Sequence, residues 1–505
     1  MEGKKLSTYR MMFCLAMMLI LVSGCSDAET GGEESSGDET LDISMALNFD
    51  GTEAPSSGSD VEAKLEELTN TELDITHMVS ANFCDRLPVL IASGDLPDVI
   101  ASCGPPNQSY LLSAMQDDVF WEIGEYLDQF PTLASMADIV YENVSINEEL
   151  YGIPRYRPLS RFVTVYRQDW LDNLGLEEPT NFDEFVDVMR AFTFDDPNQS
   201  GEDDTRGYTS VSLPGQFGFD FGLAHGSPHM WDVDESGNFT KDHETEEFLE
   251  GLKFSRQVFE EGLVNSDIVA PDRSAREADF ENGVSGMWAA SSNNVLSIEA
   301  ALKSNEPDAE LGVYNALEGP VGDRRLPSQM GSNGILMFPR ASVESEEHLL
   351  QLLGFFEEIA SNQEVIDLFA WGIEGEHYEL NDGVPEHIDY DKYMNAVGYP
   401  YRYPLVTAPI EESMTQGQLS ELAEYVLELE AENDELVVTD PAINLVSETE
   451  NQMGADLEQL INDAKFQFVT GEIDEDQWWE AVETWKDRGG DQVRAELEEQ
   501  YKELN

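Results

Sequence analysis

The chain has 505 residues, of which 103 are acidic and 27 basic, and its formal net charge is −76. This length predicts more than one domain, and a hydrophobic content of 41% is enough to build real cores. The charge excludes bulk attraction to nucleic acid or anionic lipid, and indicates either a saline habitat, where salt screens self-repulsion, or an ordinary secreted acidic protein.

The N-terminus has the pattern of a secretion signal. Basic residues precede the apolar run Met11–Val22, which is too short to cross a bilayer as a mature helix. The following "VSGC" resembles the bacterial lipobox, so we expect a signal peptide over 1–24 and lipidation of Cys25. A plain secretory signal with a chance cysteine is the alternative. Residues 25–40 are rich in Gly, Ser and acid and predict an acidic tether.

The next 60 residues predict a parallel sheet with helical crossovers. "LDISMALNF" (41–49) alternates like a strand, "DVEAKLEELTN" (60–70) fits a helix, and "LDITHMV" (73–79) is a second strand. Residues 85–102 then favour a helix followed by a strand.

Two cysteines flank that last unit. In an αβ unit the start of the helix and the end of the next strand lie at the same sheet edge, which permits a Cys84–Cys103 disulfide outside the cell. Two free thiols are the alternative.

Later segments favour helices. "TNFDEFVDVMRAF" (180–192) has an apolar face, and Thr180 is its expected cap. Helical patterns also occupy residues 245–262, 345–361 and 416–433, and nearly all of 456–504.

An acidic loop directly follows the predicted helix over 180–192. Counted from Asp196, its spacing matches an EF-hand-type calcium loop, with a glycine at position 6, but Gly207 stands where the last acidic ligand should be. The alternative is a solvated acidic turn. The expected Ca²⁺ ligands are Asp196, Asn198, Ser200, Glu202 through its carbonyl, and Asp204.

Several stretches resemble the lipid-anchored branch of the family 1 extracellular solute-binding proteins, the capture subunits of carbohydrate ABC importers related to alginate-binding proteins. They span most of the mature chain in the family's order: "ASGDLPDVI", "LYGIPRY", "VYRQDWLDNLGLEEPTNFDEF", "DPNQSGEDDTRGY", "FENGVSGMW", "WGIEGEHYEL" and "ETWKDRGGDQVRAELEEQY". Calcium in that family is structural. Related alginate binders have a Glu after the last Asp of the loop, where this chain has Thr205.

The resemblance implies an α/β, two-lobed periplasmic-binding-protein fold with hinge crossovers and a helical C-terminal part. The expected crossings lie near 151–161, 323–329 and 399–405. The first lobe is then 41–158 plus 326–400, and the second is 159–325 plus 401–505. Ligands bind between such lobes, which close on them.

Arginine is scarce, with 17 in the chain, yet six fall at the expected crossings. Guanidinium groups bind carboxylates in a bidentate manner, so a cluster here favours an anionic ligand such as a uronate-containing oligosaccharide. Alternatively, these arginines pair with neighbouring acids and fix the hinge. The six are Arg155, Arg157, Arg161, Arg324, Arg325 and Arg402, of which all but Arg324 are candidate ligand contacts.

Sugar sites also use aromatic faces and polar groups at helix starts. A strand-to-helix turn follows Trp288 in the sequence. The further candidates are Tyr156, Trp231, Trp371, Tyr399 and Tyr401, with Ser291, Ser292 and Asn293 in that turn.

We therefore expect a monomeric lipoprotein on the outer face of the bacterial cytoplasmic membrane, without catalytic residues, that binds an oligosaccharide and delivers it to ABC permease subunits. A secreted carbohydrate-active enzyme and a peptide-binding or structural surface lipoprotein stay open. A glycosidase needs two placed carboxylates, and any pair can be imagined among 103 acids. The sequence has no HExxH or GxSxG motif.

Overall fold

A computed structural model describes residues 40–51, 54–210, 212–213, 220–267, 273–410, 413–417 and 419–504. The predicted signal peptide, the lipidated Cys25 and nearly all of the tether lie outside these ranges. Within them, no helix combines the length and apolar character needed to cross a membrane.

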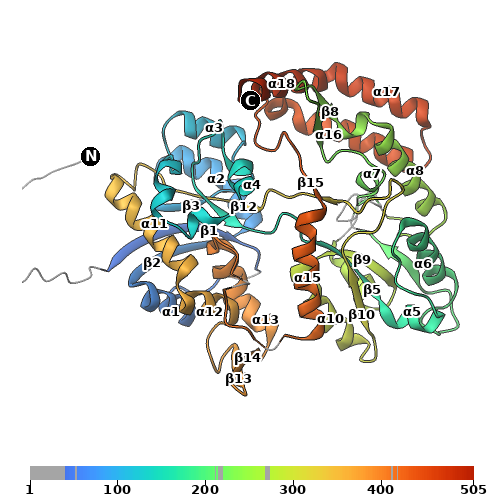
Figure 1. Ribbon diagram of the computed structural model, residues 1–505, viewed down its shortest axis with the longest axis horizontal. Coiled ribbons are helices and arrows are strands. Elements are labelled where there is room, and N and C mark those ends of the chain that lie inside the picture. The colour runs from blue at the N-terminus through green and yellow to red at the C-terminus, as the bar shows by residue number, and fades with distance from the viewer. Residues whose placement is uncertain are drawn as a thin grey trace, which may run out of the picture. The chain divides into compact units, whose positions relative to one another are not determined.

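The first sheet has five strands in the order β2-β1-β3-β12-β4 (Figure 1). Strand β1 runs parallel to β2 and β3, whereas β12 is antiparallel to β3 and β4, so β4 runs in the same direction as β1. One hydrophobic core joins this sheet to its helices. The strands are β1 (Leu41–Phe49), β2 (Thr71–Val79), β3 (Val99–Ala101), β4 (Ile153–Tyr156) and β12 (Ser332–Met337). The helices are α1 (Asp60–Thr69), α2 (Ser80–Ser93), α3 (Ser109–Gln116), α4 (Asp138–Val144), α11 (Glu346–Ser361), α12 (Gln363–Trp371), α13 (Tyr390–Tyr393) and α14 (Tyr403–Leu405).

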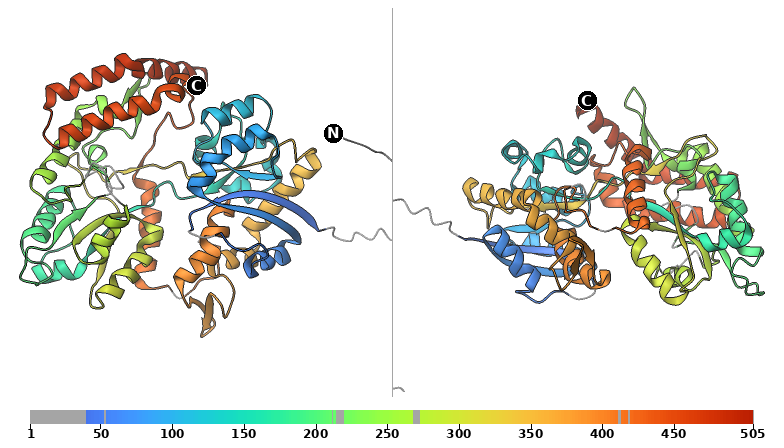
Figure 2. Two further views of the ribbon diagram at one scale, coloured as in Figure 1. Left: turned by 180° about the vertical axis from the view of Figure 1, so that it is seen from behind. Right: turned by 60° about the horizontal axis from the view of Figure 1, so that its bottom comes forward.

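The second sheet has four strands in the order β10-β5-β9-β6, with β5 antiparallel to both neighbours. Figure 2 shows the molecule from two further sides. Separate cores cover its two faces. Its strands are β5 (Phe162–Arg167), β6 (Arg206–Thr209), β9 (Ser285–Ser291) and β10 (Leu311–Tyr314). The helices are α5 (Gln168–Leu174), α6 (Phe182–Phe194), α7 (Phe221–Ala224), α8 (Glu246–Glu260), α9 (Arg273–Glu281), α10 (Val295–Asn305) and α15 (Glu421–Leu436).

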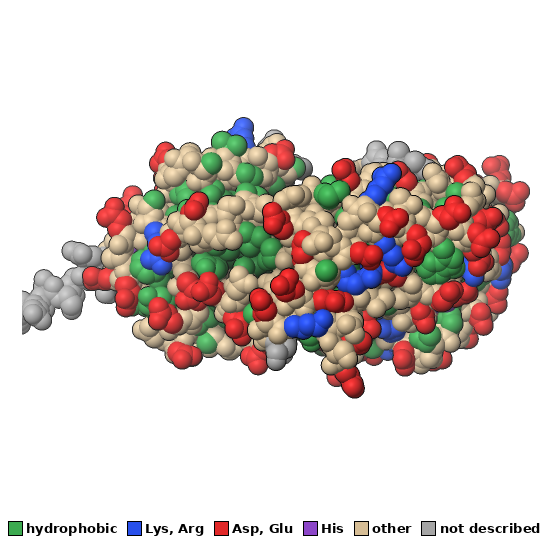
Figure 3. All heavy atoms as spheres, turned by 90° about the horizontal axis from the view of Figure 1, so that it is seen from above, with side chains coloured by type: hydrophobic (Ala, Val, Ile, Leu, Met, Phe, Trp, Pro, Cys, Tyr) green, Lys and Arg blue, Asp and Glu red, His purple; other side chains and the backbone are tan. Residues whose placement is uncertain are grey.

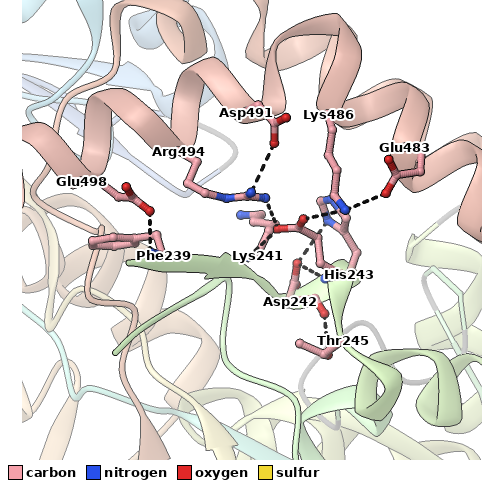
Figure 4. Close-up of polar contacts among 11 residues, drawn as sticks. Phe239, Lys241, Asp242, His243, Thr245, Glu483, Lys486, Asp491, Arg494 and Glu498 are labelled. Atoms are coloured by element: carbon pink, nitrogen blue, oxygen red, sulfur yellow. Dashed lines mark hydrogen bonds and ion pairs between the residues drawn. The ribbon is translucent and has the colours of Figure 1, made fainter. Parts of the chain in front are cut away.

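The C-terminal helices pack on α8 and on a two-stranded ribbon. Two basic side chains hold them there, because Lys486 and Arg494 both form ion pairs with Glu244, whose side chain is 8% exposed. Figure 4 shows both basic side chains pointing toward the segment Lys241–Thr245. These elements are α16 (Glu448–Val469), α17 (Glu475–Trp485), α18 (Asp491–Leu504), β7 (Trp231–Val233) and β8 (Phe239–Lys241). Two further strand pairs are β11 (Leu326–Pro327) with β15 (Val437–Val438), and β13 (Tyr378–Asn381) with β14 (Val384–His387).

The early elements match the sequence predictions within a few residues. Strand β1 has the predicted bounds, and α1 begins at the predicted Asp60, where the Ser59 side chain caps it. The predicted cap of α6 is wrong by one residue. Asn181 is the cap, and Thr180 instead donates to the side chain of Glu184.

The first two of the three expected crossings fall in segments that connect strands. The chain passes from β4 to β5 through residues 157–161, and from β10 to β12 through residues 315–331. The third is wrong, because residues 399–405 lie in the π-helix Met394–Arg402 and in α14, and they pack in the first core. That core continues to Ile410, and helix α15 then contributes Val426 and Leu429 to the second sheet's core. The expected boundary at residue 400 therefore falls inside a packed helical segment.

A disulfide joins Cys84 in α2 to Cys103, directly after β3, with the Cα atoms 5.6 Å apart. Strand β3 follows α2 through a short loop that begins at Gly94, whose φ is 71°. The start of the helix and the end of the next strand are therefore brought to the same edge of the first sheet.

Candidate functional site

Arg157 and Asp50 lie at one edge of the first sheet. Because β1 and β4 run in the same direction, their carboxyl ends meet at that edge, where ligands of open α/β sheets bind. Asp50 directly follows β1 and Arg157 directly follows β4. A guanidinium nitrogen of Arg157 lies 3.6 Å from a carboxylate oxygen of Asp50, and the Arg157 side chain is 25% exposed.

Arg161 lies at the start of β5, beside the end of β9. Its Nη1 donates to Asn293 Oδ1 at 3.0 Å, and its Nε reaches Gln329 Oε1 at 3.4 Å. Asn293 belongs to a short 3-10 turn, Ser292–Asn294, that follows β9 and leads into α10, as the sequence predicted. Ser292 in this turn donates to the carboxylate of Glu430.

The charge of Arg161 acts on the pKa of Arg157. Burial and the charge of Arg161 lower the pKa of Arg157 to about 10, against the opposing effect of Asp50. Burial likewise lowers the pKa of Arg161, with Tyr403 acting against it. Both guanidinium groups remain charged at neutral pH, so two cations share one partly buried region between the sheets.

Two tyrosines lie in the same region. The rings of Tyr399 and Tyr403 are 6.0 Å apart at an angle of 68°, and both side chains are partly exposed. A Cβ added to Gly51 would lie 3.5 Å from the Cβ of Tyr399, so the chain after β1 passes close to this tyrosine. Burial raises the pKa of Tyr399, with smaller effects from Tyr403 and from acids that include Asp50. Tyr399 is therefore placed beside Asp50 at the sheet edge.

Arg155 is not in this exposed group. Its side chain is 1% exposed and donates to Asn48 Oδ1 and the Ser102 carbonyl oxygen at 2.8 Å each, and to the Asn333 carbonyl oxygen. These acceptors belong to three segments of the first sheet, so its contacts are those of an internal brace. The predicted role of Arg155 as a ligand contact stays a prediction, and in this structure its contacts are internal.

Three aromatic candidates are also buried away from this region. Trp231 is 3% exposed and packs with Phe239 and Trp485 among the C-terminal helices. Trp371 is 4% exposed, and its indole nitrogen donates to the carbonyl oxygen of Thr415. Tyr401 is fully buried, with its hydroxyl on Ser59 and Glu62. All three are core residues in this structure.

The remaining candidates have internal contacts. Arg325 Nη1 donates to the Leu223 carbonyl oxygen at 3.3 Å in the second sheet's layer, and Arg402 Nη1 reaches the Tyr393 hydroxyl at 3.3 Å. The Tyr156 backbone nitrogen donates to the Val406 carbonyl oxygen. Ser291 is the last residue of β9 and is partly buried. Arg324 forms an ion pair with Glu432, which the hinge alternative expected.

Sequence reasoning missed Asp50 and Tyr403. Asp50 follows a strand that was correctly predicted, so the rule that ligands bind at carboxyl ends could have selected it. The sequence around Tyr403 has no comparable feature that would select it, because the family resemblance implied a crossing at 399–405.

The acidic loop 196–204 turns its polar side chains toward one another. Asn198 Nδ2 and Ser200 Oγ both donate to Asp204 Oδ1, at 3.0 and 3.1 Å, and the Gly201 nitrogen donates to the Asp196 carboxylate. Thr205 is turned away and donates to the Phe192 carbonyl oxygen. The described residues contain no group of three or more His, Cys, Asp or Glu side chains arranged for a metal. The loop would hold a cation with two carboxylates plus amide, hydroxyl and carbonyl oxygens.

Two cavities lie elsewhere in the described part of the chain. One of about 370 Å³ is lined by residues that include Asp220, Asp242 and Lys465, and the other, about 610 Å³, lies between α16 and α17. Neither includes the arginines at the crossings. Figure 3 shows acidic side chains spread over the whole visible face, with the few basic ones scattered among them.

Curated relatives cover nearly the whole chain. The polygalacturonan/rhamnogalacturonan-binding protein YtcQ of Bacillus subtilis (strain 168) is 33% identical over 443 residues, which cover 87% of each chain. Lipoprotein LipO of the same organism is 30% identical over 504 residues, covering 96% of this chain and 97% of its own.

Solved structures share the fold. The alginate-binding protein AlgQ2, in a structure without calcium ion, has a TM-score of 0.66 at 19% identity and covers 92% of this chain and 98% of its own. An EF-hand mutant of the Streptococcus pneumoniae substrate-binding protein FusA, in complex with fructo-nystose, has a TM-score of 0.68 at 19% identity, with coverages of 92% and 99%.

The family model for bacterial extracellular solute-binding proteins matches residues 57–365. With the two relatives and the shared two-lobed α/β fold, this match shows that the chain belongs to the bacterial extracellular solute-binding protein family.

Proposed function

We propose that this protein captures an acidic, uronate-containing oligosaccharide for a carbohydrate ABC importer and binds it between the two sheets. The relative YtcQ is named for polygalacturonan and rhamnogalacturonan, and both polymers contain galacturonate. The family match supports capture over catalysis as the role of the region between the sheets.

The observation that supports an acidic ligand is the kind of partner that Arg157 and Arg161 have within the protein. In a chain with 103 acids, Arg167, Arg190 and Arg324 each lie within 3 Å of a carboxylate oxygen. Among the described residues, Arg161 instead binds two amide oxygens, and Arg157 has one carboxylate contact at 3.6 Å. Their capacity for bidentate carboxylate binding is therefore not used by close internal partners.

The partly exposed Tyr399 and Tyr403 support a sugar as the carrier of that carboxylate. Aromatic rings pack on the apolar faces of pyranose rings, and nearby polar groups fix the hydroxyls. Asn293 and Ser292 supply such groups from the turn at the end of β9.

Calorimetry with a glycan panel tests this function. The mature protein should bind a galacturonate trimer in preference to neutral trisaccharides, and chromatography should recover the glycan unchanged. Turnover of a bound glycan at catalytic rates would replace capture with the enzyme alternative, and binding of peptides alone would contradict the sugar class.

Lipid anchoring and delivery complete the proposal. The "VSGC" motif and the relative LipO, which is named a lipoprotein, support attachment through Cys25 to the outer face of the cytoplasmic membrane. There a monomer would meet its permease subunits.

We also propose that the 196–204 loop binds Ca²⁺ as a structural ion. Its support is that the Asn198 and Ser200 side chains both donate to Asp204, and that Ser200 Oγ lies 3.5 Å from the main-chain oxygen of Glu202. The Asp196 carboxylate accepts from the Gly201 nitrogen of the same loop. Ca²⁺ accepts this mixture of carboxylate, amide and carbonyl oxygens, and the cation would offset the repulsion between Asp196 and Asp204.

Calcium should therefore raise the melting temperature. A ligand that binds only the folded state at 100 times its Kd stabilises it by about 2.7 kcal/mol. EDTA should lower the melting temperature of the wild type, measured at fixed ionic strength because any cation also screens this chain. Asp196→Ala should abolish the response. Asp195→Ala removes the same charge one residue earlier and should retain it. A wild type that ignores EDTA would contradict calcium binding.

A further inference from the structure

Asp50 lies at the carboxyl end of β1, near Arg157. It is the first residue after β1, an interior strand of the first sheet, and its side chain is 49% exposed at the edge where ligands of such sheets bind. It is also the carboxylate that lies nearest to Arg157.

The structure holds Asp50 short of a close ion pair. Ser80, the first residue of α2, donates through Oγ to Asp50 Oδ1 at 2.7 Å and thereby fixes one carboxylate oxygen. The other oxygen stays 3.6 Å from Arg157, beyond the 2.7–2.9 Å of a charge-assisted hydrogen bond. Arg157 itself is held by its backbone nitrogen on the Gly331 carbonyl oxygen.

The charge of Asp50 acts on the whole arginine group. It opposes the effect of burial on the pKa of Arg155 and Arg157, and also on that of Arg161, where Tyr403 and Glu430 act more strongly in the same direction. Arg155 is enclosed and has three acceptors, so the two arginines on which an incoming anion would compete with Asp50 are Arg157 and Arg161.

We propose that Asp50 is a specificity-determining residue: an internal counter-charge that an acidic ligand displaces from Arg157, and that sets how strongly the site prefers acidic over neutral sugars. This inference rests on the proposed function. Its alternative is that Asp50 accepts hydrogen bonds from sugar hydroxyls, in which case it would contribute equally to neutral and acidic ligands.

The test compares Asp50→Asn with Asp42→Asn. Asp42 lies exposed near the opposite end of the same strand, so its substitution removes the same net charge far from the site. The probes are a galacturonate trimer and its methyl-esterified form, which share a skeleton and differ in charge, and calorimetry gives the affinity of each.

Asp50→Asn should raise the affinity for the galacturonate trimer roughly three- to tenfold and leave the affinity for the methyl ester within twofold. The amide keeps the shape of the side chain and removes the repulsion between the Asp50 carboxylate and the ligand carboxylate. The gain should shrink at high salt and vanish in an Arg157→Gln background. Asp42→Asn should resemble the wild type.

Three results would overturn the inference. Equal losses for both trimers would assign Asp50 to hydroxyl binding, an Asp50→Asn protein identical to Asp42→Asn would make it a bystander, and a gain that survives Arg157→Gln would place the effect elsewhere. A wild-type protein that does not prefer the galacturonate trimer over its methyl ester would instead contradict the proposed ligand class. Asp50→Asn should even then create such a preference, because Arg157 and Arg161 would lose their shared counter-charge.

Discussion

Arg157→Ala should weaken binding of a galacturonate trimer by about 2–4 kcal/mol, roughly 30- to 1000-fold in Kd. The reason is that the ligand carboxylate would enter a partly buried region and lose its bidentate partner there. The methyl-esterified trimer should lose much less affinity, since its ester groups offer Arg157 only a neutral hydrogen-bond acceptor in place of the carboxylate. Calorimetry on both trimers, with thermal melting of the free protein, measures the two effects separately.

Arg324→Ala is the matched control for this prediction. Arg324 also lies at a crossing, but it forms an ion pair with Glu432 at 2.7 Å and donates to the Ala316 carbonyl oxygen. Its loss should lower the melting temperature and leave the ratio of acidic to neutral affinity unchanged. If Arg157→Ala behaves in the same way as Arg324→Ala, both arginines are hinge structure and the acidic-ligand proposal fails.

Periodicity predicted the first layer of the fold because short-range pattern and burial agree there. Strand β1 alternates and α1 has a single apolar face, and each element buries the face that its pattern indicates. The crossing at 399–405 was expected from the family resemblance, and the structure has a helical segment there instead. Burial of Tyr401 against Ser59 and Glu62, more than 300 residues earlier in the chain, stabilises a helical turn there despite Pro400.

The candidate site was predictable only in part, because residue type does not reveal burial. The concentration of arginine at the crossings selected Arg157 and Arg161, which are partly exposed, and equally Arg155, which the fold encloses. Trp231 and Trp371 have the chemistry of sugar platforms, but long-range packing places them in cores. Which of several aromatics faces solvent depends on partners distant in sequence, and a single sequence carries little information about those.

Because Arg155 is buried, removal of its side chain has the largest expected effect on stability. Its guanidinium ties together Asn48 at the end of β1, Ser102 after β3 and Asn333 in β12. Burial lowers the pKa of Arg155 to about 9, so the group remains charged at neutral pH and these hydrogen bonds are charge-assisted. Removing it leaves buried acceptors without a donor and opens a cavity in the first sheet's layer.

Arg155→Ala should therefore lower the free energy of unfolding by about 3–5 kcal/mol, measured by urea denaturation at neutral pH. Arg155→Lys should recover little of this, because one ammonium cannot reach acceptors on three segments as the planar guanidinium does. Where the variant remains folded at low temperature, its affinity for the galacturonate trimer should stay within about tenfold of the wild type, since Arg157 and Arg161 are intact. A variant that keeps its stability but loses acidic-ligand binding would return Arg155 to the ligand site and show that the brace opens when ligand enters.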